Sequence, residues 1–108
     1  MALFYNIKGS SVSGGQATTE LVAPDTDYSV KSVLLVNVHD SADATVTLFI
    51  QDDPTSGTTS TYEITHGVAI PSGVSLVLDG ATMFRFPNQY GLYITVAAND
   101  IVDVTVNT

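Results

Sequence analysis

The chain has 108 residues, with three basic and eleven acidic side chains, no cysteine and a formal net charge of −8. The few cations argue against a nucleic-acid groove or an anionic-membrane surface, because both need clustered lysine and arginine. The lack of cysteine excludes disulfides, thiolate zinc sites and thiol catalysis. This length, with 44% apolar residues, predicts one domain around a single core.

The first 17 residues have the composition of an arm. The segment ALFYNI, residues 2–7, suits a short strand, but its consecutive Leu3, Phe4 and Tyr5 cannot all face one side. The glycine- and serine-rich segment KGSSVSGGQATT follows and is typical of a linker. The apolar patch is too short for a signal peptide, so we expect a complete product made in a cytoplasm. We therefore expect a flexible N-terminal arm over residues 1–17 and a β-sandwich domain over residues 18–108.

The stretch Tyr28–Gln51 contains two β-branched runs, YSVKSVLLVNVH and ATVTLFIQ, separated by the polar break DSAD. This pattern predicts an antiparallel hairpin. The first run has apolar residues at both parities, which predicts a central strand. In the second run, valine, leucine and isoleucine alternate with threonine and glutamine, which predicts one buried and one wet face. Phe49 lies among the polar positions.

Further strand patterns occur at roughly 8–12-residue spacing, and no segment has a helical period. The expected strands are Glu20–Ala23, Tyr62–Ile70, Val74–Leu78, Met83–Phe86, Leu92–Ala97 and Val102–Val106. A bulge is expected in the second of these, at Gly67. The pattern predicts an all-β fold, an antiparallel and jelly-roll-like β-sandwich of eight or nine strands. A closed barrel is the competing architecture.

No constellation of residues indicates catalysis, a cofactor or a metal. The close aspartate pairs all lie in turns, where their side chains bond the local backbone. Calcium at the acidic loop QDDPTSGTT is a weaker alternative than solvation of that loop. His39 and His66 have no third ligand at zinc spacing. No nucleophile motif is present, so we expect a non-enzymatic protein.

Apolar and aromatic side chains are the remaining candidates for function. Phe49 on a polar strand face and the apolar tip of the arm suit a protein–protein contact. The candidate partner or oligomer interface comprises Leu3, Phe4, Tyr5, Phe49, Phe84 and Phe86. A carbohydrate-binding β-sandwich using Tyr62, Tyr90 and Tyr93 is an alternative, although tryptophan, the usual stacking platform, is missing.

Residues 18–108 resemble small virion proteins of tailed bacteriophages. The resemblance is carried by TELVAPDTDYSVKSVLLVNVHDSADATVTLFI, then AIPSGVSLVL, then the closing VDVTV. It implies a non-enzymatic β-sandwich that coats or joins parts of a phage particle assembled in the host cytoplasm.

Our first hypothesis within this resemblance is a capsid decoration or cement protein on the outer head surface. It would bind the major capsid protein or other virion proteins, with a homotrimer favoured. A neck, tail or fibre component of the virion is the alternative. Neither role involves nucleic acid or membrane.

Overall fold

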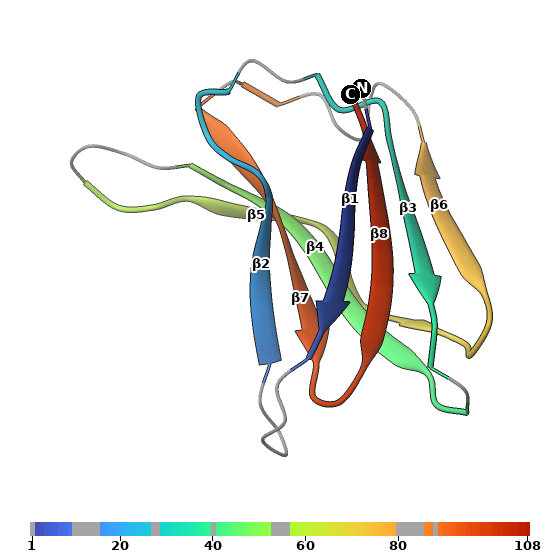
Figure 1. Ribbon diagram of the computed structural model, residues 1–108. Coiled ribbons are helices and arrows are strands. Elements are labelled where there is room, and N and C mark those ends of the chain that lie inside the picture. The colour runs from blue at the N-terminus through green and yellow to red at the C-terminus, as the bar shows by residue number, and fades with distance from the viewer. Residues whose placement is uncertain are drawn as a thin grey trace.

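The computed structural model describes residues 2–9, 16–26, 29–39, 41–52, 57–79, 86–87 and 89–108. These residues form eight strands and no helix. The strands are β1 (Ala2–Lys8), β2 (Gln16–Val22), β3 (Ser32–Asn37), β4 (Ala44–Asp52), β5 (Thr61–Ile70), β6 (Ser75–Asp79), β7 (Tyr90–Ala97) and β8 (Ile101–Asn107). Figure 1 shows them in two layers, with the N- and C-terminal ends side by side.

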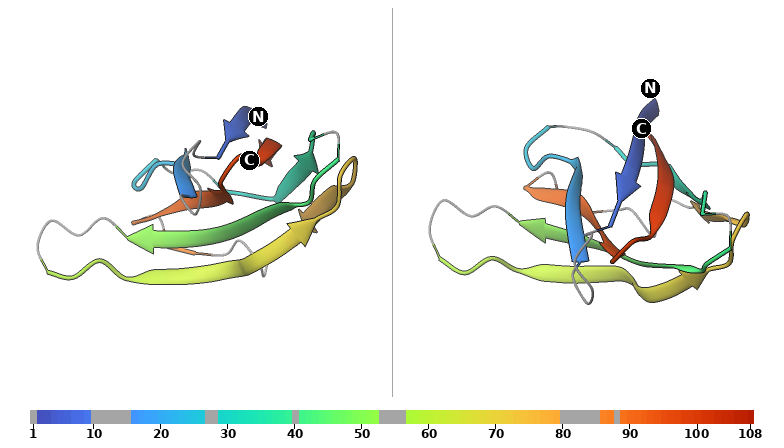
Figure 2. Two further views of the ribbon diagram at one scale, coloured as in Figure 1. Left: turned by 90° about the horizontal axis from the view of Figure 1, so that it is seen from below. Right: turned by 60° about the horizontal axis from the view of Figure 1, so that its bottom comes forward.

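The strands pair in a nested order. Sheet A has the order β1-β8-β3-β6 and sheet B the order β2-β7-β4-β5, and every pairing is antiparallel. Thus β1 pairs with β8, β2 with β7, β3 with β6 and β4 with β5. Rolling one long hairpin into two layers produces this order, which is that of the eight-stranded jelly roll. The predicted jelly-roll-like sandwich is confirmed, and two separate sheets replace the alternative of one closed barrel (Figure 2).

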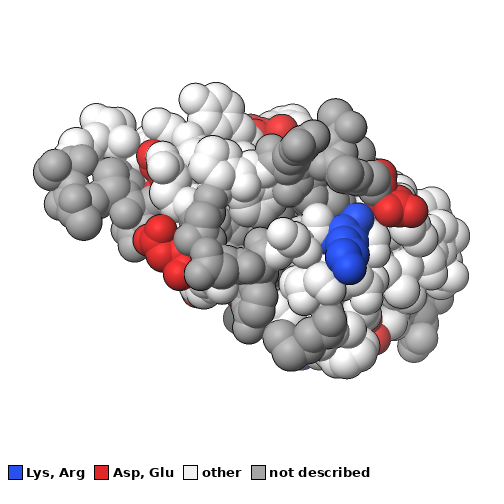
Figure 3. Space-filling model, turned by 90° about the horizontal axis from the view of Figure 1, so that it is seen from above, with Lys and Arg blue, Asp and Glu red and all other residues white. Residues whose placement is uncertain are grey.

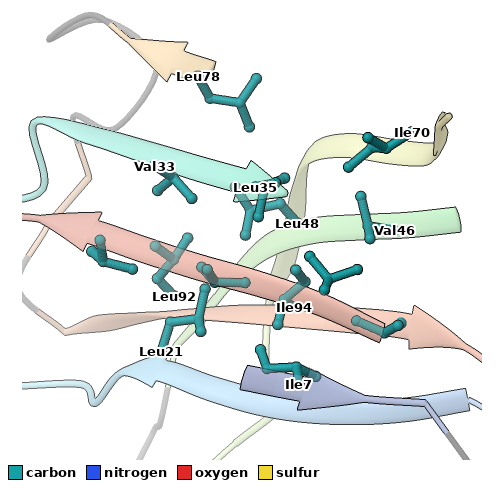
Figure 4. Packing of buried hydrophobic residues seen from close by; sticks show 14 of the residues in the cluster. Ile7, Leu21, Val33, Leu35, Val46, Leu48, Ile70, Leu78, Leu92 and Ile94 are labelled. Carbon is teal, nitrogen blue, oxygen red and sulfur yellow. The ribbon is translucent and has the colours of Figure 1, made fainter. Parts of the chain in front are cut away.

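The core lies between the two sheets, where alternate side chains of each strand meet. Val33 and Leu35 of sheet A face Leu48 and Ile94 of sheet B, and all four are fully buried (Figure 4). The predicted alternation in β4 is confirmed, because Val46 and Leu48 are buried while Thr45 and Thr47 are not. Burying one such aliphatic side chain contributes roughly 1.5–3 kcal/mol, so this layer holds the sheets together.

The predicted hairpin between β3 and β4 is wrong, because the two strands belong to different sheets. β3 is a central strand, as predicted, but its partners are β8 and β6. The buried Asn37 at the end of β3 fixes the path of the chain from sheet A to sheet B. Its Nδ2 donates to the carbonyls of Ala42 and Ile70, both at 2.8 Å, and its Oδ1 accepts from the His39 amide at 2.9 Å. Local turn signals mark where a chain bends without saying which sheet it enters.

The expectation of a flexible arm over residues 1–17 is also wrong for residues 2–8, which form β1. β1 pairs with β8 over seven residues, from Ala2 opposite Asn107 to Lys8 opposite Ile101. Gly9 follows, and a Cβ at this position would lie 1.9 Å from the carbonyl oxygen of Ala97. This close approach requires glycine, so a residue that suggested a linker serves packing instead. Residues 10–15 lie outside the described part of the chain.

Candidate binding surfaces

Of the six residues predicted to form an interface, the five that the structure describes do not form one patch. Leu3 and Tyr5 lie on the inner side of β1 and pack against the core, and the Tyr5 hydroxyl donates to the Leu21 carbonyl at 2.5 Å. Phe86 also packs half-buried against the core. Phe84, with most of the predicted strand Met83–Phe86, lies outside the described residues. Among the five described residues, only Phe4 and Phe49 lie on outer faces, and they belong to opposite sheets.

The outer face of sheet A carries a row of mostly apolar side chains across all its strands. Phe4 of β1 lies opposite Thr105 of β8, which lies opposite Leu34 of β3, which lies opposite Val77 of β6. Phe4 is 76% exposed and Val77 is 60% exposed. We call Phe4, Thr105, Leu34 and Val77 the apolar row. Large apolar side chains aligned across a whole sheet leave an unusual amount of apolar surface in water.

A shallow hollow of about 310 Å³ lies beside Phe4, between β1 and β8. At its side the Asn6 amide donates to the Asp103 carboxylate, with 2.6 Å between Nδ2 and Oδ1. The next row across the sheet therefore consists of Asn6 of β1, Asp103 of β8 and Val36 of β3, and its first two residues are polar. The face has an apolar centre and a polar border, which is the layout of a protein–protein interface.

The outer face of sheet B is centred on an aromatic pair. Phe49 of β4 and Tyr93 of β7 are directly opposite each other, and their rings stack with centroids 5.5 Å apart and an interplanar angle of 16°. The Tyr93 hydroxyl is 3.4 Å from Oε2 of Glu20 on β2. Tyr93 alternates with the buried Leu92 and Ile94, so this pair faces away from the core.

A bulge in β5 places two polar side chains next to Phe49. The register shifts between Val46 and Leu48, and Gly67 has a φ of +56°, a left-handed conformation that favours glycine. Glu63 and His66 are three residues apart and would face opposite sides of a regular strand. A second register shift, between Leu48 and Phe49, falls between Glu63 and Thr65 on β5. It brings Glu63 and His66 to the outer face, where His66 Nδ1 contacts Glu63 Oε2. The bulge predicted at Gly67 is confirmed by the first of the two shifts.

These side chains surround a second shallow hollow, of about 280 Å³, which we call the β4–β5 hollow. Its lining residues are Thr47, Phe49, Thr61, Glu63, His66 and Thr95. Thr47 accepts a hydrogen bond from the backbone amide of Gly67 at 3.0 Å, and Thr61 accepts one from the side-chain amide of Gln51 at 2.9 Å. The hollow therefore has one aromatic wall and a rim of hydroxyl, carboxylate and imidazole groups.

A second aromatic pair lies on the other side of sheet B, near the end of the β4–β5 hairpin that reaches past sheet A (Figure 2). The rings of Tyr62 and Tyr90 are 6.0 Å apart and tilted by 50°. Partial burial raises the pKa of Tyr90, and Tyr62 and Asp52 raise it further. The tyrosines predicted for sugar binding are therefore split, because Tyr93 lies on the opposite face.

The charges on the described surface are scattered. Figure 3 shows acidic side chains at separated places on one face and a lysine or arginine at one place. The described cations, Lys8 and Lys31, lie on β1 and just before β3. Within the described ranges, no three histidine or acidic side chains are grouped to hold a metal ion. The same residues include no helix of the length and apolarity needed to cross a membrane.

The fold has a counterpart among solved structures. A chain in the structure of infectious bursal disease virus Gx strain superposes with a TM-score of 0.52 at 10% sequence identity. The superposition covers 99% of this chain and 32% of the viral chain, so this protein spans about a third of that chain's length. At this identity the likeness concerns the fold alone. No protein-family model matches the sequence, and no curated protein is similar to it in sequence.

Proposed function

We propose that this chain is a non-enzymatic structural protein of a virion, and more specifically a decoration or cement protein on the head of a tailed bacteriophage. The fold it shares with a chain of a virus structure supports the broader role. The phrases TELVAPDTDYSVKSVLLVNVHDSADATVTLFI and AIPSGVSLVL, which resemble small phage virion proteins, support the finer one.

The apolar row is the observation that carries the proposal. The molecule measures 41 × 28 × 19 Å, so its broad sheet faces are large enough for a standard interface of roughly 800 Å² per partner. Phe4 is 76% exposed and therefore loses most of its hydration when a partner covers it. We assign this face to the contact with major capsid protein. The contact surface is therefore a paired sheet face and not the apolar tip of a flexible arm.

The strong negative charge fits a protein that assembles only on a template. With a formal net charge of −8, copies repel one another in solution. A particle surface supplies the complementary partner that overcomes this repulsion. A homotrimer around a local three-fold position is part of the proposal, and light scattering of the purified chain separates a trimer that already exists in solution from one that forms only on the particle.

The test is attachment of purified protein to heads that lack it. Phe4→Asp and Val77→Asp each put a charge in the centre of the apolar row. We expect a loss of affinity of about 100-fold or more for the double variant, because a charge without a partner is costly to bury. Thr61→Asp is the matched control, since Thr61 is exposed and lies on the outer face of sheet B, away from the apolar row. Undiminished attachment of the double variant would contradict the assignment of this face.

A neck, tail or fibre component is the second candidate within the same class. Copy number in electron micrographs of the particle separates the two roles. Decoration of a head requires on the order of hundreds of copies, whereas a ring in the neck or tail requires on the order of three to twelve. A low copy number confined to one vertex would retain the virion role and reject the decoration role.

A further inference from the structure

We propose that the β4–β5 hollow binds a neutral pyranose, the sugar unit of a surface glycan, with Phe49 as its stacking platform. The inference does not depend on the proposed virion role. It rests on four observations: the fixed aromatic pair, the polar rim, the size of the hollow and its lack of positive charge.

The aromatic wall is held in place before any ligand arrives. Phe49 stacks on Tyr93 at 5.5 Å between ring centroids, and both belong to inner strands of sheet B. A pyranose has one face of C–H groups, which is apolar and packs against an aromatic ring. A ring already fixed by a neighbour loses little conformational freedom on binding, and this improves the affinity of a shallow site.

The rim supplies hydrogen-bonding groups of the kinds that sugar hydroxyls need. Thr47 accepts from the Gly67 amide, and its own hydroxyl proton is available to a second acceptor. The Glu63 carboxylate has two oxygens, of which Oε2 contacts His66. A carboxylate can accept from two adjacent hydroxyls of a sugar at once, as it does from a bidentate donor. His66 is 82% exposed at its side chain, and its imidazole is accessible from solvent.

Size and charge narrow the class of ligand. A hollow of about 280 Å³ is slightly below the roughly 300 Å³ at which drug-sized pockets begin, and it suits one sugar ring. The four described strands of sheet B contain no lysine or arginine, while Glu20 and Glu63 lie on its outer face. An anionic sugar, such as a uronate or a sugar phosphate, would be repelled here. The chemistry therefore favours a neutral sugar.

The position of the site also fits contact with a cell surface. Sheets A and B lie back to back, so their outer faces point in opposite directions (Figure 2). If sheet A covers a capsid as proposed, sheet B faces outward. A glycan on a neighbouring cell surface would then meet the β4–β5 hollow directly.

The test is a nuclear magnetic resonance titration of the ¹⁵N-labelled full chain with methyl glycosides of glucose, galactose, mannose and N-acetylglucosamine. We expect at least one of these to shift the amide signals of Thr61, Glu63 and His66, with a dissociation constant on the order of 1 mM. Phe49→Leu keeps an apolar side chain but removes the ring, and we expect it to weaken binding by about tenfold or more.

Matched variants keep the result interpretable. Tyr62→Leu makes the same kind of change on the other side of the hairpin and should leave binding unchanged. His66→Ala alters an exposed side chain that the fold does not need, so weaker binding in this variant supports the site even if Phe49→Leu loses stability. The outcomes that would overturn the proposal are the absence of shifts with all four glycosides, shifts centred on Tyr62 and Tyr90, and tighter binding of methyl glucuronide. None of these outcomes bears on attachment to particles, which is measured separately.

Discussion

The outer faces of sheets A and B are built by the same alternation of side chains yet present different chemistry. Sheet A exposes the apolar row, with no polar group between Phe4 and Val77 other than Thr105. Sheet B exposes an aromatic pair framed by hydroxyl and carboxylate groups. In a sandwich the inner positions maintain the core, so each outer face is free to acquire its own function. A flat apolar face suits a protein partner, and a polar hollow with one aromatic wall suits a small ligand.

The largest effect is expected from deleting residues 2–8, which removes β1. Sheet A would lose the edge that carries Phe4, and the inner side chains of β8 would lose cover from Leu3, Tyr5 and Ile7. We expect a loss of more than about 5 kcal/mol in the free energy of unfolding, comparable to the whole stability of a small domain. Thermal unfolding followed by circular dichroism measures this. A cooperative transition close to that of the intact chain would restore the view of this segment as an arm.

A smaller effect separates the two exposed phenylalanines. Phe4→Ala should change the free energy of unfolding by less than about 0.5 kcal/mol, because the ring is 76% exposed. Phe49→Ala should cost about 1–2 kcal/mol, because it removes the half-buried ring that stacks on Tyr93. Denaturant unfolding of both variants measures the difference. Equal costs would mean that Phe4 packs against its own sheet and is less available to a partner.

Much of the fold could be predicted from the sequence, because alternation is a local signal. The alternation in β4 correctly predicted its buried side, and β8 shows the same alternation of buried and partly exposed residues. Pairing between distant strands has no such signal. The sequence after Asn37 is typical of a hairpin turn, yet the chain enters the other sheet there. The Asn37 side chain fixes this path by hydrogen bonds to the carbonyls of Ala42 and Ile70. Gly9 reads like a linker residue because a sequence does not reveal that a carbonyl lies 1.9 Å from its missing Cβ.

The candidate surfaces were less predictable, since each combines residues from several strands. The consecutive apolar residues of β3 predicted a central strand, and Leu34 in that run belongs to the apolar row on the outer face. Val77 lies at a solvent-facing position of an alternating strand, as many valines do. It could be assigned to the apolar row only from its register opposite Leu34. Glu63 and His66 reach one face only through the register shift between Leu48 and Phe49, which falls between them on β5. A bulge can be suspected from glycine, but the side chains it redirects cannot be identified without the paired strand.

The smallest effect expected distinguishes the two aromatic pairs of sheet B. Burial raises the pKa of Tyr90, and Tyr62 and Asp52 add to this by favouring the neutral phenol. Asp52→Asn keeps an oxygen to accept from the Ser60 amide but removes the charge, so the pKa of Tyr90 should fall while staying above its ordinary value. A phenol with a raised folded-state pKa stabilises the fold below its unfolded pKa, and that stability is lost as pH rises through the folded value. The variant should therefore lose a smaller increment of stability over this alkaline range. Tyrosinate absorbance measures the pKa of Tyr90, and Asp79→Asn is the control. An unchanged Tyr90 titration would show that burial and Tyr62 alone account for the raised pKa.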